Sequence, residues 1–369
     1  MASIKSIILM LSFFIGYINC GNLNIRNSFN DQFYNDIRKL IKRKMHENSA
    51  YQDSSKENSL NIPTPILVEN WPQNKLELGQ VVAVSINPSG NPVIFHRGNR
   101  IWDETTFNGT NHFQHIDEGP ISENTIYILN SHNGIIEDGW GKDLFYMPHG
   151  MTIDMHGNYW ITDVGMHQIF KFKAFERTPV ITLGKLFQPG SSTHHFCKPT
   201  AIAVATTGEF FVSDGYCNQR ILKYNAAGRL LRTIPQPPEF MSLQVPHGIT
   251  LLEHLDLLCI ADRENMRVVC PKAGLKSSFG EGQPAATIQE PDLGRVFDVA
   301  AYGDIVYAIN GPTSPIFPVR GFTLDPRAET VIDHWGEFSN PHSITVCKNG
   351  SALYVAEIGP NTVWKYVLV

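Results

Sequence analysis

Short apolar runs that end in a polar residue recur along the chain between turns rich in Gly, Asp and Asn. Their β-branched and aromatic content and the turn residues that flank them predict β-strands. The pattern is clearest in residues 93–96, 159–163, 210–214, 258–262, 306–310 and 353–357. We therefore expect an all-β fold in which these six segments are equivalent strands.

A further strand precedes each of these segments, and a third strand follows most of them. The preceding strands lie near Val82, His149, Pro199, His247, Val296 and His342, so most repeats span about 45–51 residues. Repeats of this length, with three visible strands and room for a fourth, are typical of β-propeller blades. The sequence predicts a six-bladed propeller of NHL-like repeats over residues 66–369.

The first two repeats are spaced more widely than the others, with 67 residues between Val82 and His149. The additional residues lie around Asn99–Glu118, a polar segment that contains Trp102 and two phenylalanines. We interpret this segment as a long loop over one face, where it can help to form a substrate cleft.

Three repeats begin with Pro-His, and they alternate with repeats that lack the histidine. His149, His247 and His342 follow one another at intervals of 98 and 95 residues. A propeller brings the start of every innermost strand to one central channel, so the three imidazoles should converge there. Three imidazoles with an open fourth position are typical of a catalytic zinc site. We predict that they bind Zn²⁺; the alternative is that each histidine only fills the channel as a satisfied polar residue.

A second pattern follows the segments that end in a polar residue. Arginine stands directly after two of them, as Arg97 in blade one and Arg263 in blade four, and Tyr216 lies one residue beyond the matching position in blade three. Arginines can hold a carboxylate, and a tyrosine near cationic groups can act as a general acid or base. The alternatives are salt bridges between blades and a packed aromatic ring.

Composition narrows the class of protein. The net charge of −5 and the 18% of charged residues give no basic stripe, so we expect no nucleic-acid partner. After the N-terminal run, no stretch approaches the 18 consecutive apolar residues of a membrane helix, and we expect no membrane span. We also expect a monomer.

The N-terminal region differs from the repeats. Residues 1–20 have the charge, apolar run and small residues of a secretory signal peptide, which predicts export. Residues 21–65 form a polar leader, disordered or helical, in which Lys42-Arg43 is an alternative dibasic processing site. Sequons at Asn108 and Asn349 are compatible with glycosylation.

Cysteine usage agrees with an oxidising compartment. Two neighbouring pairs each fall within one repeat, so we expect disulfides between Cys197 and Cys217 and between Cys259 and Cys270. Cys347 then remains as a free, buried thiol.

Longer motifs resemble those of the peptidyl-α-hydroxyglycine α-amidating lyase family, in order and with matching spacing from about residue 66 to the C-terminus. The matching stretches are residues 93–98, 148–150, 157–164, 195–200, 212–218 and 261–265. The resemblance implies a six-bladed propeller with a metal-containing channel, zinc on His149, His247 and His342, the same two disulfides, and a catalytic set of Tyr216, Arg97 and Arg263. It also implies the second step of peptide amidation, in which a peptidyl-α-hydroxyglycine gives a peptide amide and glyoxylate.

The expected chemistry follows from these residues. Zinc lowers the pKa of the substrate's α-hydroxyl group, and Tyr216, ionised or nearly so beside Arg263, removes its proton. Arg97 stabilises charge on the tyrosinate or on the glyoxylate carboxylate. Because the family is often fused to a copper monooxygenase for which this chain has no room, we expect a separate monooxygenase to supply the substrate.

One position departs from the family pattern. The resemblance implies a structural Ca²⁺ in the channel, bound by backbone carbonyls at Val84 and Met151 and by an Asp directly after the third zinc histidine. This chain has Ser343 there. A hydroxyl is a weaker calcium ligand than a carboxylate, so calcium is expected only through carbonyls and water.

Two other classes of protein compete with this interpretation. A secreted, non-catalytic NHL-type propeller would share the strand pattern but would not need histidines on alternate blades. A calcium-dependent, lactonase-like propeller would need carboxylates in the channel, and its candidates are Asp163, Asp214, Asp262 and Glu357.

Overall fold

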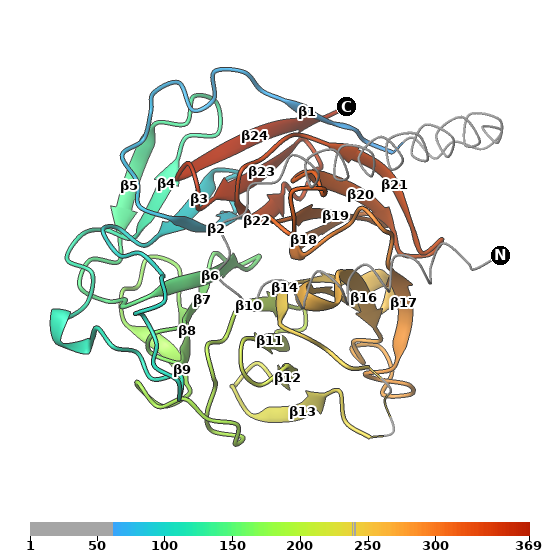
Figure 1. The fold of residues 1–369 in the computed structure, drawn as a ribbon, viewed down its shortest axis with the longest axis horizontal. Helices are drawn as coiled ribbons and strands as arrows, with labels where there is room; N and C mark the ends of the chain where they lie inside the picture. Colours follow the sequence, from blue (N-terminus) through green and yellow to red (C-terminus); the bar gives the residue numbers. More distant parts are fainter. Residues whose placement is uncertain (1–61, 238, 240) are drawn as a thin grey trace, which may run out of the picture. The chain divides into compact units, whose positions relative to one another are not determined.

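The apolar runs form the strands of six antiparallel, four-stranded sheets arranged around a central axis (Figure 1). The structure, a computed structural model, describes residues 62–369 apart from 238 and 240. The predicted six-bladed propeller is therefore confirmed. The expected signal peptide and all but the last residues of the polar leader lie outside the described residues.

The first five blades take their strands in chain order, from the channel outward. Blades one and two contain β2 (Val81–Ile86), β3 (Pro92–His96), β4 (Ile126–Leu129), β5 (Ile136–Trp140), β6 (Pro148–Ile153), β7 (Tyr159–Asp163), β8 (Gln168–Phe172) and β9 (Pro179–Leu183). Blades three to five contain β10 (Ala201–Val204), β11 (Phe210–Asp214), β12 (Arg220–Tyr224), β13 (Leu230–Ile234), β14 (Pro246–Leu252), β15 (Leu257–Asp262), β16 (Arg267–Pro271), β17 (Pro284–Ile288), β18 (Val296–Tyr302), β19 (Ile305–Asn310), β20 (Gly321–Asp325) and β21 (Thr330–Trp335).

Blade six joins the two ends of the described chain. Its inner strands are β22 (Pro341–Val346), β23 (Ala352–Glu357) and β24 (Thr362–Leu368), and its outermost strand is β1 (Pro65–Leu67). Ile66 pairs with Val367 in this antiparallel contact. The first strand thus begins one residue before the expected boundary at 66, and its place in the last blade was not expected from the sequence.

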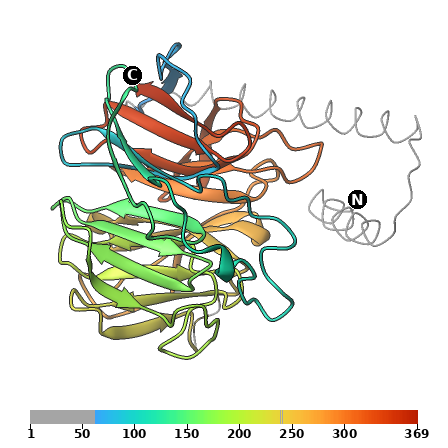
Figure 2. The same cartoon turned by 90° about the vertical axis from the view of Figure 1, so that its left-hand side faces the viewer.

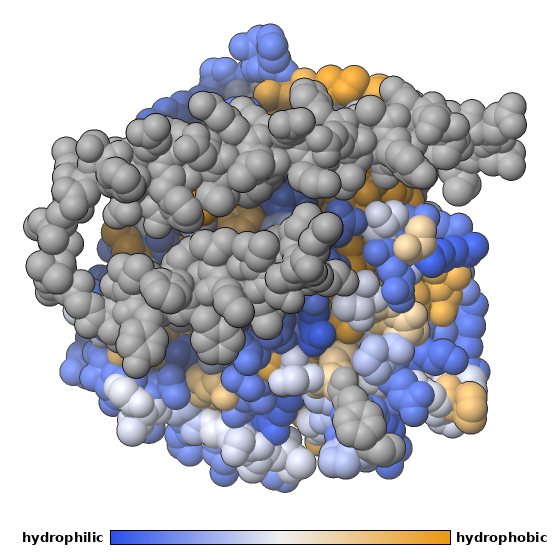
Figure 3. Space-filling view, turned by 45° about the vertical axis from the view of Figure 1, so that its right-hand side comes forward, coloured by the Kyte–Doolittle hydropathy of each residue, from blue (hydrophilic) through white to orange (hydrophobic). Residues whose placement is uncertain are grey.

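The core lies between neighbouring blades. Six clusters of buried apolar side chains each combine residues of two adjacent sheets, so every blade is packed on both faces. Strands β3, β7, β11 and β15 are buried along their whole length. A strand covered on both faces needs apolar residues at successive positions, which explains why these segments read as continuous apolar runs. On the face of the molecule shown in Figure 3, exposed hydrophobic residues form separate groups among hydrophilic ones.

Both predicted disulfides are present. Cys197 is bonded to Cys217 across the loops that flank β10 and β11, and Cys259 in β15 is bonded to Cys270 in β16. Cys347 is free and buried, as expected.

Short 3-10 helices and one long loop complete the described chain. The helices are η2 (Ile116–Glu118), η3 (Glu253–Leu255) and η4 (Arg263–Asn265). Figure 2 shows the Asn99–Glu118 segment with η2 on one side of the blades. No helix of the described residues is apolar over the length needed to cross a membrane.

Candidate metal centre and active site

The innermost strands of blades two, four and six are irregular at the predicted histidines. In β6, the pairing with β7 shifts register between Pro148 and Gly150, on either side of His149. β14 and β22 shift at the matching positions. A β-bulge re-aims the side chain of the additional residue. His149, His247 and His342 lie at these register shifts, and all three line the channel.

The Nδ1 atom of each histidine contacts a backbone carbonyl oxygen of the next blade around the ring. The acceptors are Thr200 for His149 at 2.8 Å, Phe297 for His247 at 2.7 Å and Val82 for His342 at 2.6 Å. Because a carbonyl oxygen only accepts hydrogen bonds, Nδ1 carries the proton in all three rings and Nε2 keeps its lone pair. The carbonyl oxygen of the next blade therefore sets the tautomer of each histidine, in the same way in all three repeats.

The three histidines fit a metal ion. Their ligand atoms all lie within 4.8 Å of one another, and the side chains are buried. Burial lowers the pKa of His149 and His247 well below the usual value and that of His342 to about 3, and neighbouring positive charges act in the same direction. The imidazoles are thus neutral at physiological pH, which is the form that binds zinc. The hydrogen-bonded Nδ1 atoms supply the outer contacts that orient zinc-binding histidines.

Tyr216 faces the same cluster from blade three. Its Oη lies 3.0 Å from Nε2 of His149 and 3.2 Å from Nε2 of His247. The residue before it, Gly215, lies so close to Pro246 that an added Cβ would come within 1.9 Å of the proline carbonyl oxygen. The disulfide of Cys217 holds the other side. A close backbone approach and a covalent bond thus position this phenol beside the histidines.

The two predicted arginines lie around Tyr216. Arg97 is buried, and its guanidinium donates to Oε1 of Gln80 at 2.7 Å and to the carbonyl oxygen of Pro148 at 2.9 Å. Cζ of Arg263 lies 5.2 Å from the centroid of the Tyr216 ring. The structure therefore brings together all six predicted zinc and catalytic residues.

Burial and the neighbouring arginines have opposite effects on the protonation of Tyr216. Burial raises the pKa of its phenol above the usual value, while Arg263 and Arg97 oppose that rise. The cost of burying a phenolate is thus larger than the stabilisation by the two arginines alone. Ionisation of Tyr216, which the expected chemistry requires, therefore depends on further positive charge at the histidines.

The long loop between blades one and two reaches the site. The ring of Trp102 lies 4.9 Å from that of Tyr216 and 6.1 Å from that of His149, between centroids. Cζ of Arg97 lies 5.3 Å from the centroid of the same indole. Trp102 thus covers the phenol, which agrees with the interpretation of this loop as one wall of a cleft.

The four carboxylates expected for a lactonase-like site have other partners. Asp163 accepts backbone N–H groups of Tyr146 and Met147, and Asp214 accepts that of Cys197. Asp262 and Glu357 make equivalent bonds in blades four and six. Each carboxylate fixes the loop that leads into the innermost strand of its own blade. They are structural groups, which removes the main support for the lactonase-like interpretation.

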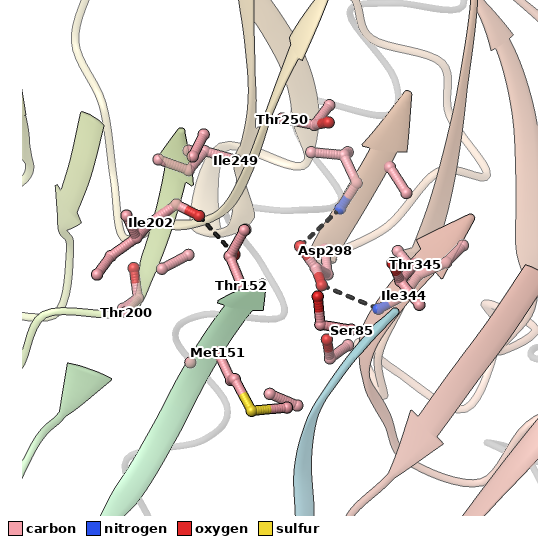
Figure 4. A pocket seen from close by; sticks show the side chains of 18 of the residues that line it. Ser85, Met151, Thr152, Thr200, Ile202, Ile249, Thr250, Asp298, Ile344 and Thr345 are labelled. Carbon is pink, nitrogen blue, oxygen red and sulfur yellow. Dashed lines mark hydrogen bonds between the residues drawn. The ribbon is translucent and has the colours of Figure 1, made fainter. Parts of the chain in front are cut away.

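Beneath the histidines, the channel contains a cavity of about 240 Å³ whose lining includes Val84, Met151 and Ser343. Asp298 also faces this cavity (Figure 4). Its carboxylate accepts the backbone N–H groups of Val299 and Ile344, both at 2.9 Å. Burial raises the pKa of Asp298 to about 7. Sequence reasoning did not select Asp298, although alignment of the repeats places it at the position of Ser343.

Comparison with known proteins gives the same family. The chain is 62% identical to peptidyl-α-hydroxyglycine α-amidating lyase 2 of Drosophila melanogaster, over 92% of this chain and 91% of that protein. The chain belongs to this lyase family. A probable peptidyl-α-hydroxyglycine α-amidating lyase of Caenorhabditis elegans is 36% identical to this chain, over 90% of this chain and 92% of that protein. Peptidyl-glycine α-amidating monooxygenase B of Xenopus laevis is 39% identical, and the match spans 35% of that longer protein.

Other comparisons concern the fold of the lyase alone. Residues 145–172 and 196–224 match the model of the NHL repeat, which confirms the NHL-like character of these blades. A solved structure of a nidogen/laminin complex covers 75% of this chain and 85% of the matched chain, with a TM-score of 0.52 and 15% identity. At that identity the likeness shows only a shared propeller architecture.

Proposed function

We propose that this lyase is zinc-dependent and cleaves a peptidyl-α-hydroxyglycine to a C-terminally amidated peptide and glyoxylate. The observation that carries the proposal is the convergence of three neutral imidazoles beside the Tyr216 hydroxyl. Membership of the lyase family supports the reaction, and the names of its relatives support the substrate class.

The protein's own residues account for the proton transfers. His149, His247 and His342 would hold zinc, which supplies a Lewis acid beside the reacting hydroxyl. Tyr216, in its phenolate form in the loaded site, accepts the proton of the α-hydroxyl as general base. The C–N bond then breaks with its electron pair on the amide nitrogen, which takes a proton from Tyr216 or water, while the α-carbon becomes the aldehyde of glyoxylate.

The two arginines favour the charged form of the phenol. Arg263 and Arg97 both lower the pKa of Tyr216, and a divalent cation at the adjacent histidines acts in the same direction. Arg263 is also paired with Glu264, whose Oε1 lies 3.0 Å from Nε of the arginine. Among the described residues, the side-chain hydrogen bonds of Arg97 go to the neutral acceptors Gln80 and Pro148.

The first test is turnover of a synthetic peptide that ends in α-hydroxyglycine. We expect stoichiometric glyoxylate and peptide amide, loss of both after dialysis against a chelator, and recovery when zinc is added. Peptide that binds without cleavage would instead support the alternative of a non-catalytic NHL-type binding module. Cleavage that is insensitive to chelation, with no metal in the protein, would contradict the zinc dependence.

We also propose that the channel binds a structural Ca²⁺ and that Asp298 supplies its carboxylate ligand. Ser343 stands where the family pattern has Asp. Its Oγ accepts a hydrogen bond from the backbone N–H of Val84 at 3.3 Å, and its side chain is hydrogen-bonded to Asp298. Gly248 leaves room for the carboxylate, because a Cβ there would come within 1.8 Å of Asp298 Oδ1. A carboxylate of the neighbouring blade thus faces the cavity where Ser343 provides none.

Calcium should therefore stabilise the wild-type protein, and Asp298→Asn should reduce that stabilisation. A ligand at 100 times its Kd raises the free energy of unfolding by about 2.7 kcal/mol. Melting temperature measured with and without calcium checks this, and Ser343→Ala is the control that keeps the carboxylate. Equal calcium responses of the wild type and Asp298→Asn would contradict the assignment of Asp298.

We propose that the protein is secreted as a monomer and receives substrate from a separate copper monooxygenase. Two disulfides support an oxidising compartment, and the names of longer relatives associate this domain with a monooxygenase. Recovery from culture medium and light scattering test the location and the oligomeric state. Retention inside the cell would contradict secretion.

A further inference from the structure

Lys198 adds a third positive charge to the active site. It follows Cys197, whose disulfide partner Cys217 follows Tyr216, so one disulfide links the backbone segments of both side chains. Nζ of Lys198 lies 5.8 Å from the centroid of the Tyr216 ring and 4.8 Å from that of Phe107. The ammonium group therefore stands over the face of the phenol whose hydroxyl contacts the histidines.

The position of this ammonium group is fixed by backbone geometry and by the long loop. Lys198 has a positive φ of 58°, and its backbone N–H donates to Nδ1 of His167 at 3.0 Å. Nζ donates to Oδ1 of Asn111, also in the long loop, at 2.9 Å. Lys198 thus spans from the blade-three segment to the loop that forms the wall of the cleft.

The charge of Lys198 has no acidic partner in the described part of the chain. Among these residues, its side chain donates one hydrogen bond, to the neutral amide of Asn111. An ammonium group has three N–H donors, so two remain for a ligand. Partial burial lowers the pKa of Lys198, because it removes water from around the ammonium group. A carboxylate bound there would supply the missing countercharge.

The other two cations of the site are already engaged. Arg263 is paired with Glu264, and Arg97 is buried with bonds to Gln80 and Pro148. Both arginines lower the pKa of the Tyr216 phenol. The arginines therefore have several partners in the site, whereas two N–H donors of Lys198 remain for the substrate.

We propose that Lys198 binds the carboxylate of the terminal α-hydroxyglycine. The inference rests on the proposed function, because that substrate carries one carboxylate next to the carbon whose C–N bond breaks. Lys198 then orients the substrate so that its hydroxyl reaches Tyr216. It also explains how the enzyme selects a free C-terminus, since an internal residue has no carboxylate to offer.

The test compares two substrates that differ only in this charge, a peptidyl-α-hydroxyglycine and its methyl ester. A charge-assisted hydrogen bond contributes about 10- to 100-fold in binding. We expect Lys198→Gln to lower kcat/KM for the acid by about that factor, mainly through KM, and to change the ester little. The ester alters intrinsic reactivity equally in every variant, so the ratio of the two substrates isolates the contact.

Two variants separate binding from loop support. Asn111→Ala removes the loop contact but keeps the ammonium group, and we expect it to affect acid and ester equally. Lys198→Arg should keep most of the preference for the acid. Melting temperature and zinc content identify any variant that does not fold. If Lys198→Gln does not fold, the ratio of kcat/KM for the acid to that for the ester is compared between Lys198→Arg and the wild type.

The possible results are distinct. Equal losses on acid and ester in Lys198→Gln would overturn the proposal and leave Lys198 as a support for the loop. A loss seen only with peptides that have an acidic residue before the hydroxyglycine would also overturn it, in favour of a different carboxylate. Failure of the wild type to cleave either substrate would contradict the proposed function, not the assignment of Lys198.

Discussion

Tyr216→Phe should lower kcat by about 10²- to 10⁴-fold while the protein stays folded and keeps its metal. The substitution removes only the hydroxyl that lies 3.0 Å from His149 and 3.2 Å from His247. The ring contacts with Trp102 and Arg263 remain, so the site keeps its shape. Single-turnover rates with saturating substrate, together with zinc analysis, measure the effect on the chemical step.

Tyr146→Phe is the matched control. Tyr146 packs against Phe113 and Phe187 near the same loop, but it does not contact the histidines in the described structure. We expect near-normal turnover in this variant. Near-normal turnover in Tyr216→Phe with zinc bound would show that another group moves the proton.

His247→Ala should abolish stable zinc binding and lower activity by more than about 100-fold, the upper range for loss of a residue that only supports a metal ligand. Two imidazoles remain in the variant, and the carbonyl oxygen of Phe297 loses its donor. A structural zinc site needs four ligands and a catalytic one needs at least three, so two histidines are insufficient. Metal content after gel filtration and glyoxylate release check both parts.

The matched control is His156→Ala, because His156 lies exposed in a turn of blade two and its described contact is through the backbone. This variant should keep its zinc and its activity. Equal zinc content in His247→Ala and in the wild type would contradict the assignment of the metal site.

The repeat pattern was sufficient to predict the blades and the histidines. Middle strands such as β7 are buried on both faces, and this burial is visible in the sequence as a continuous apolar run. Equivalent residues of a propeller converge by symmetry, so His149, His247 and His342 could be placed in one site without side-chain geometry. The disulfide pairs followed because each lies within one blade.

Other features depend on contacts that the pattern does not encode. β1 has three residues, too few for a periodic signal, and its partner strand lies about 300 residues away. The protonation of Tyr216 depends on how desolvation compares with the charges of two arginines. The role of Lys198 depends on a left-handed backbone position and on a loop from another blade. Asp298 could have been found from the sequence, because a full alignment of the repeats places it at the position that Ser343 occupies in blade six.

Blade six combines the first described strand with the last three, and this arrangement constrains the order in which the blades can form. During synthesis from the N-terminus, β1 is made before the other described strands, whereas its partner β24 is made after them. His342 belongs to the same final blade as β24. A nascent chain can therefore form the earlier blades and still lack its third imidazole. Zinc held by all three histidines, as proposed above, could therefore bind only after the blade that contains His342 has formed.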